Sequence, residues 1–187
     1  NITNKSKDPK VDINKKGPSL AYANQEIRYD FEIRNTGNVE LNDFTWYEFL
    51  PFEYGKATRI STGTYNQELS YNVYYRTNKK PEYLVLAENL STKVNNYIDL
   101  EKIYLEDDEK ITEIKIKYGD VNVYFAEEEK PQIYMKLKED LTENQEVRNT
   151  TILEGKHNDY KICDEDEVTT IIRENKPEPK KLPRTGF

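Results

Sequence analysis

Glu26-Ile27-Arg28-Tyr29-Asp30-Phe31-Glu32-Ile33-Arg34 alternates apolar and charged residues without interruption. Because successive side chains of a strand point to opposite faces, its four apolar residues would share one face and its charged residues the other. One face is then buried and one solvated, as in a strand of an antiparallel sandwich. The next four residues, 35–38, read Asn-Thr-Gly-Asn and have the chemistry of a turn.

Further short strands are expected on both sides of this one. Residues 41–50 place Phe44, Trp46, Glu48 and Leu50 on one face, and Pro51 ends that strand. Residues 95–105 fit either a short helix or a loop. The remaining strands are predicted at 11–15, 57–60, 69–75, 83–86, 111–118, 132–138, 147–153 and 167–172. Many short strands with turns between them predict an all-β fold, an antiparallel sandwich followed by an extended C-terminal tail.

The composition of the chain supports a single domain and argues against a nucleic-acid partner. The chain has 187 residues, of which 35% are hydrophobic, and 15 Tyr and 6 Phe supply large side chains for one core. The net charge of −7, with acids and bases interspersed, argues against a nucleic-acid partner. The domain is predicted at 10–173, after a linker at 1–9 and before a Pro/Lys/Glu-rich stalk at 174–181.

No cofactor or metal site is predicted. Cys163 is the sole cysteine and His157 the sole histidine, so neither a disulfide nor a zinc ligand set is expected. The acidic runs 106–109 and 164–167 lack the spacing of a calcium loop, and a solvated turn or a charged edge strand is the favoured interpretation. The sequence also lacks the usual nucleophile, zinc-helix and phosphate-loop motifs of enzymes.

The chain ends in Leu182-Pro183-Arg184-Thr185-Gly186-Phe187. This stretch resembles the LPxTG sorting signal of Gram-positive surface proteins. The resemblance implies that a sortase cleaves between Thr185 and Gly186 and passes the Thr185 carbonyl to an amine of peptidoglycan. The polar stalk before the motif would stay extended and accessible. We expect a signal peptide, and an apolar helix with a basic end, in the longer protein, so that a membrane is contacted only through that further tail.

Three further motifs occur in order along the chain: Tyr29-x-Phe31-x-Ile33-x-Asn35-Thr36-Gly37-Asn38-Val39, then Leu50-Pro51, then Val147 to Gly155. Together they resemble the immunoglobulin-like conserved repeat of Gram-positive surface proteins, with Glu48 where the family has an aspartate before Leu-Pro. This second resemblance covers roughly residues 10–168, and it implies an immunoglobulin-like sandwich.

Three polar residues fall on faces that the alternation predicts to be buried: Lys15, Glu48 and Asn149. Burying an unpaired charge costs several kcal/mol, so each needs a partner. Pilins and adhesins of related fold join a first-strand Lys to a late-strand Asn by an isopeptide bond, assisted by a buried acid. The chemistry needs a neutral amine and a protonated acid, and burial moves both pKa values in that direction. We therefore predict a Lys15–Asn149 bond with Glu48 as the acid.

Simpler interpretations remain open at this stage. Asn149 could hydrogen-bond the backbone across the sheet, and Lys15 could lie one register out and reach solvent. Lys10 or Lys16 would be the inward lysine if the strand carried a bulge.

These features predict a non-enzymatic, cell-wall-anchored protein on the extracellular surface of a Gram-positive bacterium. Its sandwich would act as a stalk or adhesin module, with sortase and peptidoglycan as partners. The alternatives are a pilin subunit, or an adhesin that binds host matrix protein or a glycan. Tyr71, Tyr74 and Tyr75 would be the aromatic platform of such an adhesin, although packing on both faces of a strand is favoured for them. A secreted glycoside hydrolase with paired carboxylates is the least favoured alternative.

Overall fold

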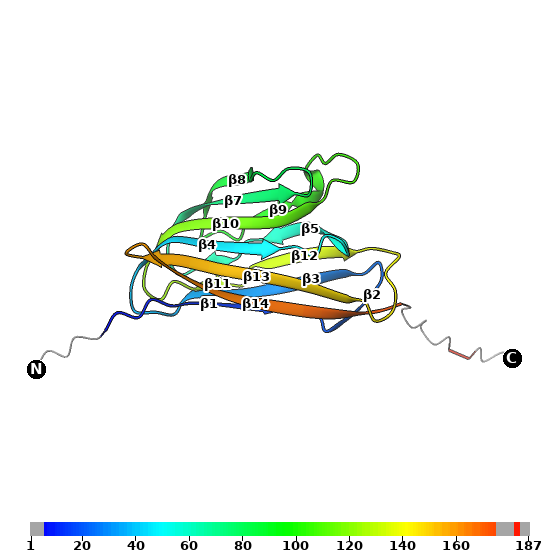
Figure 1. The fold of residues 1–187 in the computed structure, drawn as a ribbon, viewed down its shortest axis with the longest axis horizontal. Coiled ribbons are helices and arrows are strands. Elements are labelled where there is room, and N and C mark those ends of the chain that lie inside the picture. Colours follow the sequence, from blue (N-terminus) through cyan, green and yellow to red (C-terminus); the bar gives the residue numbers. More distant parts are fainter. Residues whose placement is uncertain (1–5, 175–181, 184–187) are drawn as a thin grey trace, which may run out of the picture.

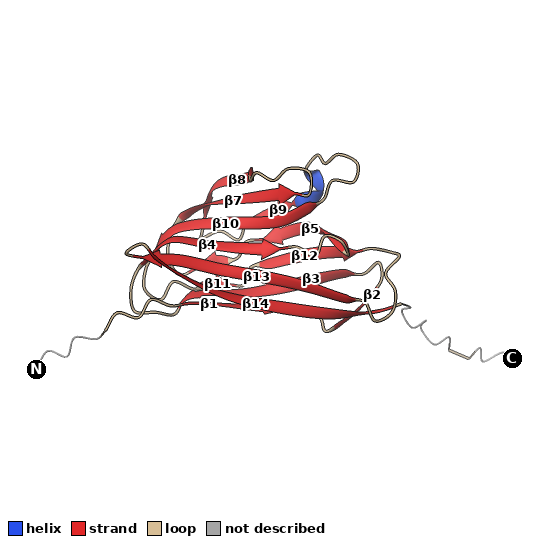
Figure 2. Cartoon of the chain, viewed as in Figure 1, coloured by secondary structure: helices blue, strands red, loops and turns tan. Residues whose placement is uncertain are grey.

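The computed structural model describes residues 6–174 and 182–183. Over these residues the regular secondary structure is strand, apart from one short 3-10 helix, η1 (Leu100–Lys102) (Figure 2). This part of the chain has no helix long and apolar enough to cross a membrane. The strands are β1 (Val11–Lys16), β2 (Leu20–Tyr22), β3 (Glu26–Asn35), β4 (Leu41–Phe49), β5 (Gly55–Ser61), β6 (Thr64–Tyr65), β7 (Ser70–Thr77), β8 (Leu84–Ser91), β9 (Tyr97–Asp99), β10 (Ile111–Val121), β11 (Glu127–Glu129), β12 (Gln132–Leu137), β13 (Glu146–His157) and β14 (Tyr160–Arg173).

Two large sheets stack into a sandwich (Figure 1). Within the described residues, one sheet has the order β1-β3-β12-β5-β9 and the other the order β2-β14-β13-β4-β10-β7-β8; β6 and β11 form a small third sheet. The predicted all-β sandwich is confirmed. One pair departs from the antiparallel expectation, because β2 runs parallel to β14. Residues 95–105, where a helix or a loop was expected, contain β9 and η1.

The alternating stretch of the sequence is β3, and its apolar face forms the middle of the core. Ile27, Tyr29, Phe31 and Ile33 are each at most 3% exposed. Phe31 packs on Trp46 of β4 in the opposite sheet, with ring centroids 4.5 Å apart. Complete burial of side chains of this size contributes about 1.5–3 kcal/mol each, so this face contributes strongly to the stability of the sandwich.

A β-bulge in β10 places two isoleucines at an odd spacing on the same face of the sheet. Ile111 and Ile114 are both buried, although an odd spacing puts them on opposite faces of a regular strand. The pairing of β10 with β7 shifts register between Ile111 and Glu113, and the extra residue returns both isoleucines to the core.

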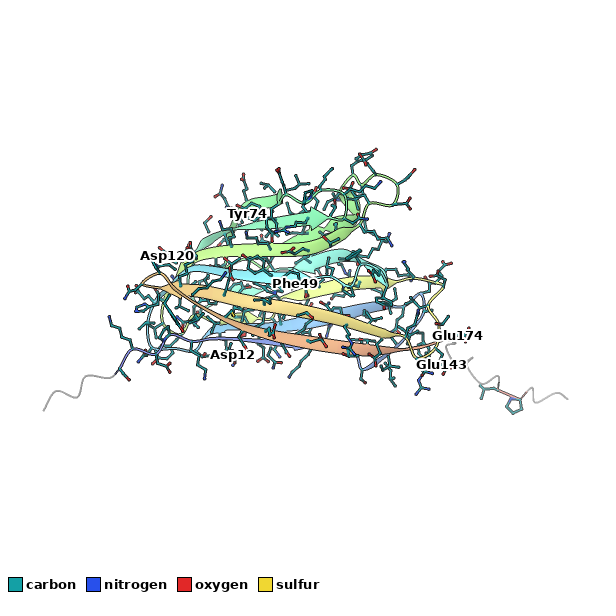
Figure 3. All side chains as sticks on the ribbon, viewed as in Figure 1. Asp12, Phe49, Tyr74, Asp120, Glu143 and Glu174 are labelled. Atoms are coloured by element: carbon teal, nitrogen blue, oxygen red, sulfur yellow. The ribbon has the colours of Figure 1, made fainter. Side chains whose placement is uncertain are left out.

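Carboxylates close the seam between β1 and β14, which belong to different sheets but run side by side (Figure 1). The outward backbone N–H groups of Ile13 and Lys15 donate to Asp164 Oδ2 at 2.9 Å and to Asp166 Oδ2 at 2.7 Å. Asp12 lies on the same edge (Figure 3), and burial together with the neighbouring Asp164 raises the pKa of its carboxyl. The acidic run 164–167 therefore caps an edge strand. Among the described residues, His, Cys, Asp and Glu side chains do not gather in threes to hold a metal ion.

Replacing Asp166 by alanine tests this cap. The Lys15 N–H would lose its acceptor in a partly buried place, which should lower the free energy of unfolding by about 1–3 kcal/mol. Glu165 is exposed on the same strand, so Glu165→Ala is the matched control and should change stability by less than about 0.5 kcal/mol. Urea denaturation of both variants measures the difference; equal stabilities would remove the capping role.

Candidate functional site

Lys15 points into the sandwich from the edge strand β1. In the antiparallel pairing of β1 with β3 it stands opposite Phe31, on the same inward face as Val11 and Ile13. Lys15 is 4% exposed, whereas Lys10 and Lys16 are exposed. β1 runs without a bulge, so Lys15 is the inward lysine, and the alternative that it reaches solvent is wrong.

Glu48 meets Lys15 from the opposite sheet. It lies near the end of β4, on the face that also carries Phe44 and Trp46, and is 0% exposed. Lys15 Nζ donates to Glu48 Oε1 at 2.6 Å, with both side chains wholly excluded from solvent. Their attraction offsets the desolvation of two charges only in part, so a buried pair of this kind is weak evidence for a purely stabilising role.

Asn149 lies on β13, beside β4, and is 0% exposed. Glu48 stands opposite Thr151, so Asn149 occupies the diagonal position on the same face of the sheet. Neither Oδ1 nor Nδ2 of Asn149 has a hydrogen-bond partner among the described residues. The expected alternative, a side-chain bond to backbone across the sheet, is therefore not formed. A buried amide left in this state costs about 1–3 kcal/mol, which calls for an explanation.

Aromatic rings enclose the three polar residues. Lys15 Nζ lies 4.6 Å from the ring centroid of Tyr29 and 5.2 Å from that of Phe31. Trp46 adds another wall, and its indole N–H donates to Thr151 Oγ1 at 2.7 Å. The rings exclude water from the lysine and the glutamate, and so strengthen every electrostatic effect between them.

Burial shifts the pKa values of the pair toward its neutral form. It lowers the pKa of Lys15 to about 8, against the opposing effect of Glu48 and the acids of β14. It raises the pKa of Glu48 to about 7, against the opposing effect of Lys15. Transfer of one proton from Lys15 to Glu48 then gives a free amine and a carboxylic acid. Beside Asn149, an amine nucleophile and an acid are the groups that an amide exchange requires.

The other predicted sites stand apart from this cluster. In the sorting motif, Leu182 is 90% exposed and Pro183 is exposed, whereas Arg184, Thr185 and Gly186 lie outside the described residues. Cys163 is exposed on β14.

Tyr71, Tyr74 and Tyr75 do not form a common exposed platform. Tyr71 is 2% exposed, and its hydroxyl accepts a bond from Asn96. Tyr75 packs partly buried against the core, and Tyr74 is half-buried on the same strand (Figure 3). These tyrosines therefore pack on both faces of the strand, as the favoured interpretation of the sequence predicted.

Tyr29 is the residue of this site that sequence reasoning missed. Its inward position was expected, but its neighbours in the other sheet were not. The available signal was a hydroxyl on an otherwise apolar strand face, because a buried tyrosine hydroxyl normally needs a partner.

Comparison with known proteins gives likenesses of structure alone. No protein-family model matches the chain, and no curated protein matches it. The structure is similar to the major pilin subunit of Bacillus cereus, with a TM-score of 0.46 and 13% identity; the match covers 88% of this chain and 40% of that one. It is also similar to the collagen-binding domain of a Staphylococcus aureus adhesin, with a TM-score of 0.40 and 13% identity over 85% of this chain and 96% of that one.

A third similar structure, at 6% identity and a TM-score of 0.41, is a protein that catalyses macrocyclization in alchivemycin A biosynthesis, with 90% of this chain and 91% of that chain covered. With TM-scores below 0.5, these likenesses assign no function to the chain.

Proposed function

We propose that this chain is a non-enzymatic, covalently reinforced module of a bacterial surface protein, attached to peptidoglycan by a sortase. Two covalent links define the proposal: an internal one between Lys15 and Asn149, and an external one at Thr185. The observation that supports it most is the buried amide of Asn149, which has no partner within residues 6–174 and lies beside a desolvated Lys15–Glu48 pair.

The internal link would form by amide exchange. Glu48 takes a proton from Lys15, and the free Nζ attacks Cγ of Asn149. The Nζ–Cγ bond forms while the carbonyl electrons move to Oδ1, where the acid of Glu48 donates a hydrogen bond. Glu48 passes its proton to Nδ2, the Cγ–Nδ2 bond breaks and ammonia leaves as the carbonyl re-forms. The second proton of Nζ returns to the Glu48 carboxylate. The product is a secondary amide and one ammonia, and no oxidant or cofactor is consumed.

The position of the link suits a domain under load. Lys15 belongs to one sheet of the sandwich and Asn149 to the other. A bond between them joins the first strand to the penultimate strand and closes a loop of about 130 residues, which by the chain-entropy model is worth about 4–5 kcal/mol. Pulling on the chain ends would then leave the segment between positions 15 and 149 unstretched.

The external link follows from the LPRTG motif. A sortase would break the amide bond between Thr185 and Gly186 and join the Thr185 carbonyl to an amine of peptidoglycan. This places the domain outside the cell, on the wall. As the three tyrosines of β7 do not form a binding platform, we favour a stalk over an adhesin for host matrix protein or glycan.

Incubation of the full chain with a class A or class B sortase and an oligoglycine amine tests the attachment. We expect loss of the Gly186-Phe187 dipeptide and addition of the oligoglycine to Thr185, both read by intact mass. Thr185→Ala is the control and should block the reaction. An intact C-terminus after incubation with active sortases of both classes would contradict the attachment.

A further inference from the structure

Four polar side-chain atoms of the buried site have no hydrogen-bond partner among the described residues. They are Tyr29 Oη, Glu48 Oε2, and Nδ2 and Oδ1 of Asn149. A buried polar atom without a partner is rare in folded proteins, and a cluster of them is rarer. Bond formation between Lys15 and Asn149 accounts for the unpartnered atoms of Glu48 and Asn149. It does not account for the Tyr29 hydroxyl.

Packing directs Tyr29 toward Asn149. A Cβ atom on Gly17 would lie 2.6 Å from Cδ1 of Tyr29 and 3.2 Å from a methyl group of Val168, so the ring fits between β1 and β14 only because residue 17 is glycine. Val168 is the cross-strand partner of Asn149. The ring of Tyr29 therefore passes Lys15 Nζ on one side and reaches the strand pair that carries Asn149.

The hydroxyl keeps its proton at physiological pH. Burial raises the pKa of Tyr29 to about 12, although the side chains of Asn149 and Thr170, close to the hydroxyl, oppose the rise. Thr170 donates its own hydroxyl proton to the carbonyl of Pro18, so toward Tyr29 its oxygen can only accept. Oδ1 of Asn149, which has no partner among the described residues, is the second candidate acceptor for the Tyr29 proton.

We propose that the Tyr29 hydroxyl is a catalytic hydrogen-bond donor to Oδ1 of Asn149 while the Lys15–Asn149 bond forms. This assignment rests on the function proposed above. Glu48 cannot donate a hydrogen bond to Oδ1 throughout the reaction, because it first accepts a proton from Lys15 and later delivers one to the leaving ammonia. Tyr29 holds the amide carbonyl throughout and stabilises the negative charge that develops on Oδ1, without giving up its proton. Two donors then face the oxyanion, as in the oxyanion holes of acyl-transfer enzymes.

The rate of bond formation in Tyr29→Phe tests the role. The full chain is made by pulse-labelled cell-free synthesis, and intact mass at successive times follows the loss of one ammonia. We expect the phenylalanine variant to react about 100-fold more slowly, the usual loss for one oxyanion donor. Its pH profile should keep the shape of the parent profile, because Lys15 and Glu48 set that shape. Tyr65→Phe is the matched control: Tyr65 is equally buried, but its hydroxyl bonds Tyr118 and the carbonyl of Thr62.

The outcomes separate the two proposals. If the parent chain never loses ammonia, the internal link itself fails. If the parent chain reacts and Tyr29→Phe keeps its rate, the catalytic role of Tyr29 is wrong. A slowed reaction with a shifted pH profile would also overturn it, because Tyr29 would then act only by packing on Lys15. Should Tyr29→Phe fail to fold, 3-fluorotyrosine at position 29 keeps the shape and donates a more acidic proton. It should speed the reaction about twofold or more, and an unchanged rate would contradict the assignment.

Discussion

Asn149→Ala should unfold with a free energy about 4–5 kcal/mol below that of the parent chain, because the link across the sandwich cannot form. For a domain of this size the melting temperature should fall by about 10–20 °C. The direction of the change is informative. Without a link, the same substitution removes a buried amide that has no hydrogen-bond partner in the described part of the chain, and it should be neutral or stabilising.

The control for this prediction is the same substitution in a chain that cannot form the link. In a Glu48→Gln background, Asn149→Ala should be neutral or slightly stabilising. Denaturant unfolding of the four chains gives the coupling between the two sites directly. Equal, additive losses in both backgrounds would mean that Asn149 stabilises the fold by packing and not through a bond to Lys15.

Lys15→Met should be the most damaging single change in the site. It abolishes the link and also leaves the wholly buried Glu48 without its cation. At pH 8 we expect a loss of about 3 kcal/mol beyond that of Asn149→Ala, the usual cost of breaking a buried ion pair from one side.

The stability of Lys15→Met should also depend on pH in a defined direction. Burial raises the folded-state pKa of Glu48 above its ordinary value of 4.5, and removing Lys15 raises it further because Lys15 opposes the shift. The contribution of Glu48 is therefore fully present below the unfolded pKa and is lost as the pH rises through the folded pKa. Lys15→Met should be more stable at pH 5 than at pH 8.

A matched double variant isolates this effect from the other carboxylates. Lys15→Met with Glu48→Leu leaves no group in the site that titrates between pH 5 and 8, because the pKa of Tyr29 is about 12. It should therefore recover stability toward the Asn149→Ala level at pH 8. The difference between the double and the single variant should shrink as the pH falls to 5. A difference that does not change with pH would show that Glu48 is not a buried, uncompensated acid.

The alternation of apolar and polar residues was sufficient to predict which side chains point inward. β1 and β3 follow a period of two without interruption up to Lys15 and Ile33, so their faces could be assigned from local sequence. On β4 the same rule correctly places positions 44, 46 and 48 inward, although residues 41–45 of that strand break the alternation. Burial of Lys15, Glu48 and Asn149 follows from the same rule. The alternation could not predict that these three side chains lie close together, because their proximity depends on how the two sheets stack.

Tertiary contacts decided the features that were missed. β14 was expected only from residue 167, because the acids before it break any apolar alternation. It begins at Tyr160, since it pairs with β13 from that residue to Ile171, and two of those acids accept hydrogen bonds from β1. The bulge in β10 and the position of the Tyr29 hydroxyl likewise depend on neighbouring strands. The sorting motif was found by resemblance, and it stays a prediction for the sortase assay.

The mass of the intact, folded parent chain tests the Lys15–Asn149 bond most directly. We predict the sequence mass less one ammonia, with Glu48→Gln, Lys15→Met and Asn149→Ala each giving their full sequence masses. Proteolysis of the parent should release a branched peptide that joins the segment around Lys15 to the segment around Asn149. A parent chain at its full sequence mass, with Lys15 and Asn149 recovered in separate peptides, would contradict the account.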